Sequence, residues 1–250
     1  MVTSTLSFTK AGTTAMIEIL QHKIGPLLGG AASQTLPWQL CLLLLLAIGV
    51  TSVVHVFGHA WMADILGDPN PRSRGRVTLN PLAHMDVLGT LMMIATTIVG
   101  FPVGWGKNLR TNPDAYKTGP RLGLALVALA GPLANLLFAV ALAPIARWMV
   151  GELQRRGPGD ISETFLWFLM LVTATMLMNI SLFAFNLVPV APLDGTHVAA
   201  SALPLSLAIL YKKFMEKYGS YLFIALMYTG ILPGFLGPHI LRLFMILVGL

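Results

Sequence analysis

The sequence predicts an all-α polytopic membrane protein with about five to six transmembrane helices and small β-hairpin or sheet insertions. Composition and the spacing of long apolar segments support this fold class. Hydrophobic residues make up 56% of the 250 residues, only 10% are charged, and the mean hydropathy is +0.76. A soluble domain carries about 25% charged residues, so this composition is typical of a protein surrounded by lipid.

The long apolar segments give the predicted transmembrane helices, because one crossing needs about 20 largely apolar residues. Four segments follow this pattern, at residues 36–66, 87–103, 121–150 and 165–187. The remaining apolar stretches, 195–210 and 221–250, are interrupted by Pro204, Pro233 and Pro238. They are expected to supply one or two further spans, or a re-entrant segment.

Residues 36–250 are therefore predicted to form one transmembrane domain, preceded by an N-terminal segment at 1–35. A helix lying on the membrane surface is predicted over residues 12–28, where apolar and polar positions alternate. The start of the chain lacks a basic stretch followed by a continuous apolar core, so no signal peptide is expected. Cys41 is the single cysteine, which excludes an internal disulfide.

Two connections have the composition of turns and short extended pieces. Residues 67–81 and 104–113 are rich in Gly, Pro and Asn, which favours a small hairpin or sheet. Non-helical backbone at a membrane requires burial in protein or contact with water. The β insertions of the predicted fold are placed here.

The formal charge is +6, and the basic residues lie mainly in short connections: Arg72, Arg74 and Arg76, then Lys107, Arg110, Lys117 and Arg121, then Lys212, Lys213 and Lys217. In a membrane protein this pattern indicates topology and contact with lipid headgroups, so membrane lipids are predicted partners. No stripe of basic and aromatic residues accompanies the charge, which argues against nucleic-acid binding. If residues 87–103 cross the membrane, basic connections lie on both faces, and the positive-inside rule then assigns no orientation.

Two histidines within the first span are the first candidate site residues. Ionisable groups inside lipid are costly and are functional candidates for that reason. His55 and His59 are spaced i, i+4, which places both imidazoles on one helix face, as two metal ligands require. Histidines hydrogen-bonded within a bundle, or axial ligands of a haem or pigment, would show the same spacing.

The segment at 186–195, NLVPVAPLDG, is the second candidate. Pro189 and Pro192 each remove a backbone donor, and Gly195 permits a tight turn, so the fourth span is predicted to be interrupted near 188–195. This places Asp194 on irregular backbone. The carboxylate then serves as a third metal ligand, as a partner of a basic residue, or as a loop aspartate at the membrane edge.

Several segments in the same order resemble the site-2 protease family of intramembrane zinc metalloproteases. They are the histidine pair with the following HAWMADILGDPNPRSRGRVTLNPLAHMDVLGT, then GWGK at 104–107, VALAGPLANLL at 127–137 and the PxPLDG-like PVAPLDG at 189–195. The similarity covers roughly residues 45–245. It implies an integral protein of the bacterial inner membrane that acts on a transmembrane peptide or binds a membrane-protein partner.

The resemblance also implies roles for individual residues. His55, His59 and Asp194 match the zinc ligands, with one coordination position open. Asn135 and Asn186 match asparagines near the family's active site, where they contact substrate backbone or the developing oxyanion; helix–helix hydrogen bonding is the alternative. The pieces around Val77 and Lys107 match elements that receive a substrate strand by edge pairing. Three further residues match family-like positions: His84 and Asp86, expected to lock the loop, and His197.

One position departs from the family pattern and decides the predicted activity. The family glutamate that follows the first histidine, and accepts a proton during peptide hydrolysis, is Val56 here. Valine accepts no proton, and general acid–base catalysis contributes typically 10²–10⁴-fold. Asp64 lies nine residues from His55, roughly 13 Å along a helix, which is too far for proton transfer.

Three hypotheses follow for function. The predicted one is a pseudoprotease, a family member that acts as a structural or binding subunit of a membrane complex. The second is an active intramembrane metalloprotease, in which Val56 was engineered or the base comes from elsewhere. The third is a pigment- or quinone-associated subunit in which a histidine ligates a tetrapyrrole.

Overall fold

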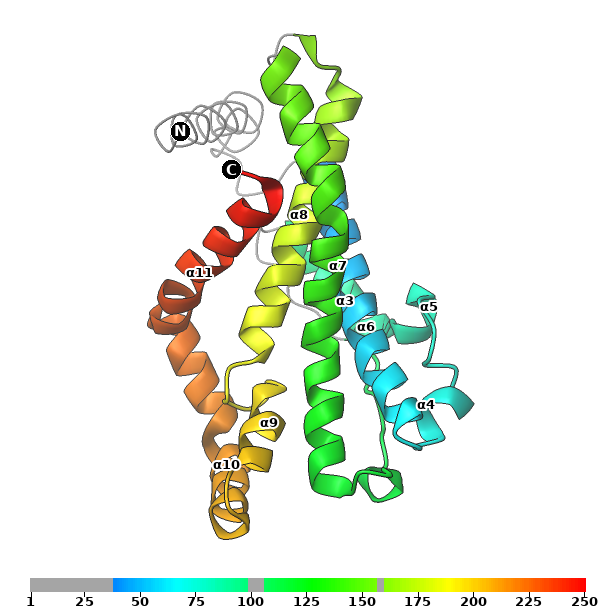
Figure 1. Ribbon diagram of the computed structural model, residues 1–250, viewed down its shortest axis with the longest axis vertical. Coiled ribbons are helices and arrows are strands. Elements are labelled where there is room, and N and C mark those ends of the chain that lie inside the picture. Colours follow the sequence, from blue (N-terminus) through cyan, green and yellow to red (C-terminus); the bar gives the residue numbers. More distant parts are fainter. Residues whose placement is uncertain (1–37, 99–105, 157–159) are drawn as a thin grey trace, which may run out of the picture.

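Four long helices dominate the computed structural model, which describes residues 38–98, 106–156 and 160–250 (Figure 1). In this part of the chain, four helices have the length and apolar composition to cross a membrane: α3 (Trp38–Ile65), α7 (Pro120–Arg156), α8 (Glu163–Asn186) and α11 (Ile231–Val248). The chain is therefore an all-α integral membrane protein. The surface helix predicted at 12–28 lies outside the described residues.

The helices α3, α7 and α8 pack side by side and form the centre of the molecule (Figure 1). Small residues allow α3 and α7 to approach closely, as in other membrane bundles. A side chain at Gly58 of α3 would lie under 3.0 Å from the Ala130 carbonyl oxygen of α7. On the other side of α7, a buried apolar cluster joins it to α8 and α11 and includes Met149, Met176, Ile180 and Phe244.

The second predicted span is not a crossing in the described residues. Its helix, α6 (Val87–Ile98), has 12 residues and is about 18 Å long, whereas the hydrocarbon core is about 30 Å thick. The segments before and after it meet, because Met85 bridges Gly106 and the Lys107 amide donates to the His84 carbonyl oxygen at 2.9 Å. The chain therefore leaves and returns on the same side of the molecule.

The predicted β insertions are reduced to that one antiparallel bridge in the described part of the chain. Two short helices, α4 (Asn70–Ser73) and α5 (Pro81–His84), occupy most of the 67–86 connection. The reason for α5 is local: the Asn80 side chain accepts a hydrogen bond from the Leu82 amide, and Pro81 fits the first helical position. Residues 81–84 therefore form a helical turn and not a strand of the predicted hairpin.

A buried carboxylate joins the two connections that the sequence treats as separate. Asp68 is 1% exposed and accepts hydrogen bonds from the Asn70 amide at 3.0 Å and the Asn112 amide at 2.6 Å. The Lys117 amide also donates to the Leu66 carbonyl oxygen at 2.8 Å. Residues 66–70 and 112–117, which include the 3₁₀ turn Pro113–Ala115, therefore lie together at one end of the bundle, whereas α5 lies nearer the middle of its length (Figure 1).

The predicted interruption of the fourth span is confirmed. The helix α8 ends at Asn186, and the next helix, α9 (Gly195–Ala202), begins after eight residues of irregular backbone that contain Pro189 and Pro192. The chain continues as α10 (Leu205–Tyr228) and α11, which are separated at Gly230, where φ is +74°. The hydroxyl of Tyr211 on α10 donates to the Pro189 carbonyl oxygen at 2.6 Å and holds the irregular segment in place.

Candidate metal centre

Three side chains from two distant parts of the sequence converge between α3 and the segment that precedes α9. The Nε2 atoms of His55 and His59 lie 3.0 Å apart, and each lies 3.3 Å from Oδ2 of Asp194. The structure thus brings together the three residues for which the sequence predicts metal ligation. They form a group of potential metal ligands in which each residue offers one donor atom.

The hydrogen bond made by Nδ1 of each histidine determines that Nε2 faces the other potential metal ligands. His59 Nδ1 lies 2.6 Å from the Val127 carbonyl oxygen, which can only accept, so Nδ1 carries the proton. His55 Nδ1 lies 2.7 Å from the side-chain oxygen of Asn135 and donates in the same way. Both Nε2 atoms therefore present lone pairs toward Asp194, the arrangement that metal-binding histidines adopt.

The orientation of Asn135 is itself fixed by a buried polar network. Its side-chain nitrogen donates to the Thr51 carbonyl oxygen at 3.0 Å and to the Asn179 side-chain oxygen at 2.7 Å. Asn179 in turn donates to the Thr51 hydroxyl at 2.9 Å and to the Thr175 carbonyl oxygen at 2.8 Å. Because both asparagine side chains are 0% exposed, this network links α3, α7 and α8 around His55.

The irregular segment before α9 directs Asp194 toward the histidines. Asp194 occupies the N-cap of α9, yet its side chain makes no capping hydrogen bond there. Gly195 permits the turn, because a Cβ at this position would lie under 3.0 Å from the Leu187 and Val188 carbonyl oxygens. The carboxylate is consequently available to the two histidines.

The donor geometry fits a tetrahedral metal ion. Zinc bonds of 2.0–2.1 Å at tetrahedral angles place neighbouring donor atoms about 3.3 Å apart, close to the observed 3.0, 3.3 and 3.3 Å. Asp194 Oδ2 is buried and has no hydrogen-bond donor in the described part of the chain, because both facing nitrogens present lone pairs. Three converging electron pairs are stabilised by a cation, so these residues fit a zinc site with one open position.

A glycine on α7 provides the space for one of the rings. A Cβ at Gly131 would lie under 3.0 Å from three atoms of the His59 imidazole, including Nε2. Gly131 lies in the segment VALAGPLANLL at 127–137, which resembles the family, but its contact with His59 is evident only in the structure. The same is true of Val127, which acts through a backbone carbonyl that any residue would carry.

The other predicted site residues lie around this centre without joining the ligand group. Val56 is half-buried on α3, directly after His55. Asn186 donates to the Leu182 carbonyl oxygen of its own helix at 3.0 Å. His84 contacts the Thr78 carbonyl oxygen at 2.8 Å, and Asp86 accepts from the Gly89 amide at 2.9 Å, so both residues stabilise the connection as expected.

His197 lies one helical turn after Asp194 on α9. Partial burial, and after it the ammonium group of Lys212, lower the pKa of His197 from its ordinary value. This imidazole therefore favours its neutral form. It is not one of the three residues whose donor atoms converge.

Asn179 is a further residue of the site that was not predicted from the sequence. An asparagine within the apolar α8 carries a usable signal, because polar side chains inside a membrane bundle are functional or structural candidates. The sequence does not, however, reveal its partners on α3 and α7.

Comparisons with known proteins agree with the site. The profile of Peptidase family M50 matches residues 149–230, which include Asp194. A protein of Bacillus subtilis (strain 168) that carries the name of a zinc metalloprotease, YwhC, is 30% identical over 193 residues, which cover 77% of this chain and 83% of that protein. A protein of Mycolicibacterium smegmatis (strain ATCC 700084 / mc(2)155) with the name of a zinc metalloprotease, Rip2, is 36% identical over 146 residues.

The second match covers 57% of this chain and 50% of the Mycolicibacterium smegmatis protein. No solved structure matches the chain significantly. The match to YwhC extends over most of both chains, and the profile match includes the segment that presents Asp194. The chain therefore belongs to Peptidase family M50, the site-2 protease family.

Proposed function

We propose that this protein is a zinc-binding, proteolytically inactive member of its family, which acts as a binding or structural subunit of a complex in the bacterial inner membrane. The proposal combines two features of one site. The ligand group has the geometry of a tetrahedral metal centre. The position of the family's proton acceptor, next to His55, is occupied by Val56.

Val56 is the observation that carries the proposed inactivity. Peptide hydrolysis requires a group that takes a proton from the attacking water and delivers one to the leaving amine. A metal ion held by His55, His59 and Asp194 would supply Lewis acidity and would lower the pKa of water. It would not supply the second proton transfer, and the aliphatic Val56 side chain has no atom that accepts or donates a proton.

The carboxylates nearest in sequence are committed to other partners, which supports the proposal. Asp64 pairs with Arg72 at 2.6 Å. Asp68 is buried against two backbone amides, and Asp86 accepts from the Gly89 amide. Within the described residues, the convergent ligand group holds no carboxylate other than Asp194, which is itself a proposed metal ligand.

The residues that orient the metal ligands remain in place although the base is absent. Asn135, Asn179 and the Val127 carbonyl oxygen all make the hydrogen bonds that orient the histidines. A metal ion held by His55, His59 and Asp194 would join α3 to the irregular segment before α9. Such a bundle is suited to binding a transmembrane segment of a partner without cleaving it.

The test is to purify the chain in mild detergent, measure its zinc content, and reconstitute it with a helix-destabilised transmembrane peptide. The wild-type chain is expected to bind about one zinc per chain, and His59→Ala is expected to abolish this binding. No cleavage of the peptide is expected, with YwhC assayed in parallel under the same conditions. Equal zinc content in wild type and His59→Ala would overturn the metal assignment. Chelator-sensitive cleavage by the wild-type chain would overturn the proposed inactivity.

A further inference from the structure

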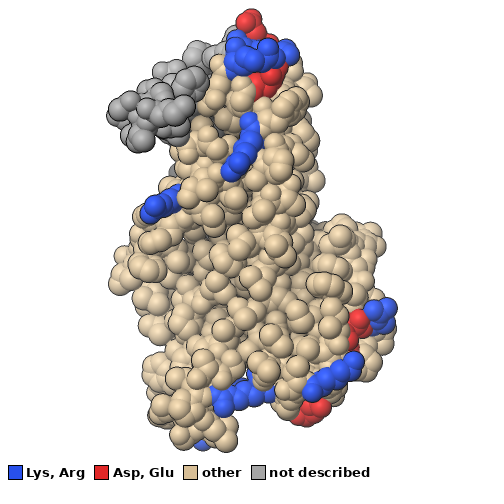
Figure 2. Space-filling model, viewed as in Figure 1, with Lys and Arg blue, Asp and Glu red and all other residues tan. Residues whose placement is uncertain are grey.

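The basic residues of the described chain are divided unevenly between the two ends of the bundle. Nine of them lie in segments 72–76, 110–121 and 212–217, and the structure brings these segments to one end: Arg72, Arg74, Arg76, Arg110, Lys117, Arg121, Lys212, Lys213 and Lys217. We call this set the basic end. In the face drawn in Figure 2, charged side chains gather toward the two ends of the molecule.

Hydrogen bonds bring the three segments of the basic end together. The first two are joined through Asp68 and through the contact of Lys117 with Leu66. The third is joined through Arg121 at the start of α7, whose guanidinium donates to the carbonyl oxygens of Ala200 and Leu203 at the end of α9, directly before α10. Figure 1 places the start of α10 and the start of α7 at the same end.

The spacing of charges along α7 places the basic end at a membrane surface. No charged residue lies between Arg121 and Arg147, and the intervening 25 residues span about 37 Å. This length exceeds the hydrocarbon thickness of about 30 Å. Arg121 and Arg147 therefore mark opposite surfaces of the bilayer, and Arg147, which donates to the Leu247 carbonyl oxygen of α11 at 2.8 Å, belongs to the other end.

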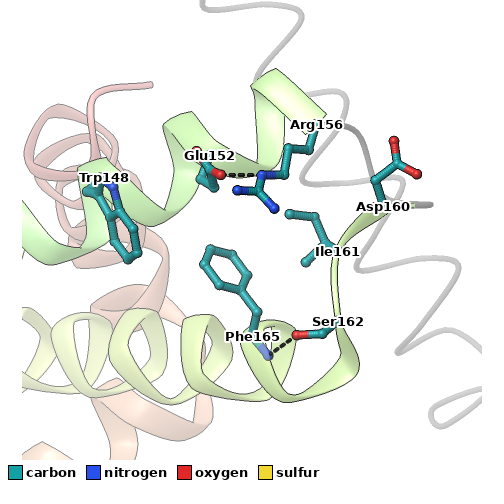
Figure 3. A pocket seen from close by; sticks show the side chains of 7 residues that line it. All are labelled: Trp148, Glu152, Arg156, Asp160, Ile161, Ser162 and Phe165. Carbon is teal, nitrogen blue, oxygen red and sulfur yellow. Dashed lines mark hydrogen bonds and ion pairs between the residues drawn. The ribbon is translucent and has the colours of Figure 1, made fainter.

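The charges of the two ends also differ in how they are neutralised. At the other end, Glu152 pairs with both Arg155, at 2.8 Å, and Arg156. Figure 3 shows the Glu152–Arg156 pair beside a pocket between α7 and α8 whose lining also includes Asp160. At the basic end, Arg72 is the one of the nine with an ion pair to a carboxylate of the described chain.

We propose that the basic end is an interaction surface for anionic phospholipid headgroups, and that it faces the cytoplasm. Short connections rich in Lys and Arg remain on the cytoplasmic side of a membrane. Each Lys or Arg near that surface raises the affinity for the anionic lipids of the leaflet by about fivefold. The inference does not depend on whether the centre at His55 binds zinc.

The lipid contact is tested with the full chain in nanodiscs that contain equal phosphatidylglycerol and phosphatidylethanolamine, with retained lipids identified by native mass spectrometry. The wild type is expected to retain phosphatidylglycerol preferentially. The double variant Arg74→Gln/Lys213→Gln is expected to weaken this preference by about fivefold per charge, whereas the matched variant Arg155→Gln/Arg156→Gln preserves it. No preference in the wild type, or equal losses in both variants, would overturn the lipid surface.

The orientation is tested with single cysteines introduced on a Cys41→Ser background. Ser73→Cys and Gln154→Cys are both at exposed positions, one at each end. A membrane-impermeant maleimide added to intact spheroplasts is expected to label Gln154→Cys and to reach Ser73→Cys only after permeabilisation. The reverse pattern would overturn the proposed orientation, and so would equal labelling of both variants before permeabilisation.

Discussion

The side-chain oxygen of Asn135 on α7 lies 2.7 Å from Nδ1 of His55 on α3. This contact fixes the imidazole so that Nε2 faces Asp194. Both hydrogens of the Asn135 amide are donated elsewhere, to Thr51 and Asn179. Asn135 therefore acts in this structure as a positioning residue for His55, one of the three residues that could hold a metal ion, and its amide hydrogens are already donated within the bundle.

The first prediction concerns this contact. Asn135→Ala removes the acceptor of the His55 Nδ1 proton, and the loss of such an outer partner typically weakens metal binding by about 10–100-fold. Zinc affinity is measured by competition with a chromogenic chelator in detergent. Asn186→Ala is the matched control, because its side chain bonds only within α8 among the described contacts. Equal zinc affinities of the two variants would contradict the assignment of Asn135.

The second prediction uses the close approach of Gly131 to His59. A methyl group at Gly131 would overlap the imidazole, so Gly131→Ala should displace the ring and lower zinc content. Gly151→Ala lies on the same helix and has no heavy atom within 4 Å of the added methyl group. It should retain wild-type zinc and, because alanine favours helix, full stability. Metal analysis of both purified variants checks the contrast, and full zinc content in Gly131→Ala would refute it.

The sequence predicted the parts of this site that depend on local spacing. The i, i+4 rule alone places His55 and His59 on one face of α3, and the prolines at 189 and 192 alone require irregular backbone before Asp194. It did not predict how these segments meet. Val127 contributes only a carbonyl oxygen, and Asn179 finds its partners on two other helices, so neither contact has a signature within its own segment.

The membrane topology also could not be predicted from the sequence. Residues 87–103 are apolar enough to suggest a crossing, and this expectation leaves the two basic connections on opposite faces. The described helix ends at Ile98, and Lys107 returns to His84. Whether an apolar segment crosses or returns depends on contacts of its flanks, which hydropathy does not encode. Here the return leaves both basic connections on the same face, so that the charges indicate an orientation.

The third prediction concerns Asp68, the carboxylate that joins the two connections. Asp68→Ala removes the charged acceptor of the Asn70 and Asn112 amides, and a hydrogen bond to a charged group contributes about 1.5–3 kcal/mol. The thermal unfolding midpoint in mild detergent should therefore fall. Asp114→Ala, at an exposed position in the same connection, should leave the midpoint unchanged. Equal midpoints for the two variants would show that Asp68 does not stabilise the junction.

The last prediction concerns Val56. Val56→Glu introduces the glutamate that the resemblance to the family implies at this position, next to His55 and on the helix that carries both histidines of the proposed metal centre. If the centre binds zinc, this variant should gain chelator-sensitive cleavage of a helix-destabilised transmembrane peptide, because general acid–base catalysis contributes typically 10²–10⁴-fold.

The assay compares reconstituted wild type, Val56→Glu and Val56→Gln, which matches the glutamate in size but accepts no proton at neutral pH. Cleavage by Val56→Glu alone is expected. Cleavage by the wild type at the rate of Val56→Glu would mean that the general base lies elsewhere in the protein. If all three forms remain inactive while each binds zinc, the substrate-binding elements have changed along with the base, because the metal and the proton acceptor would then both be present without the reaction.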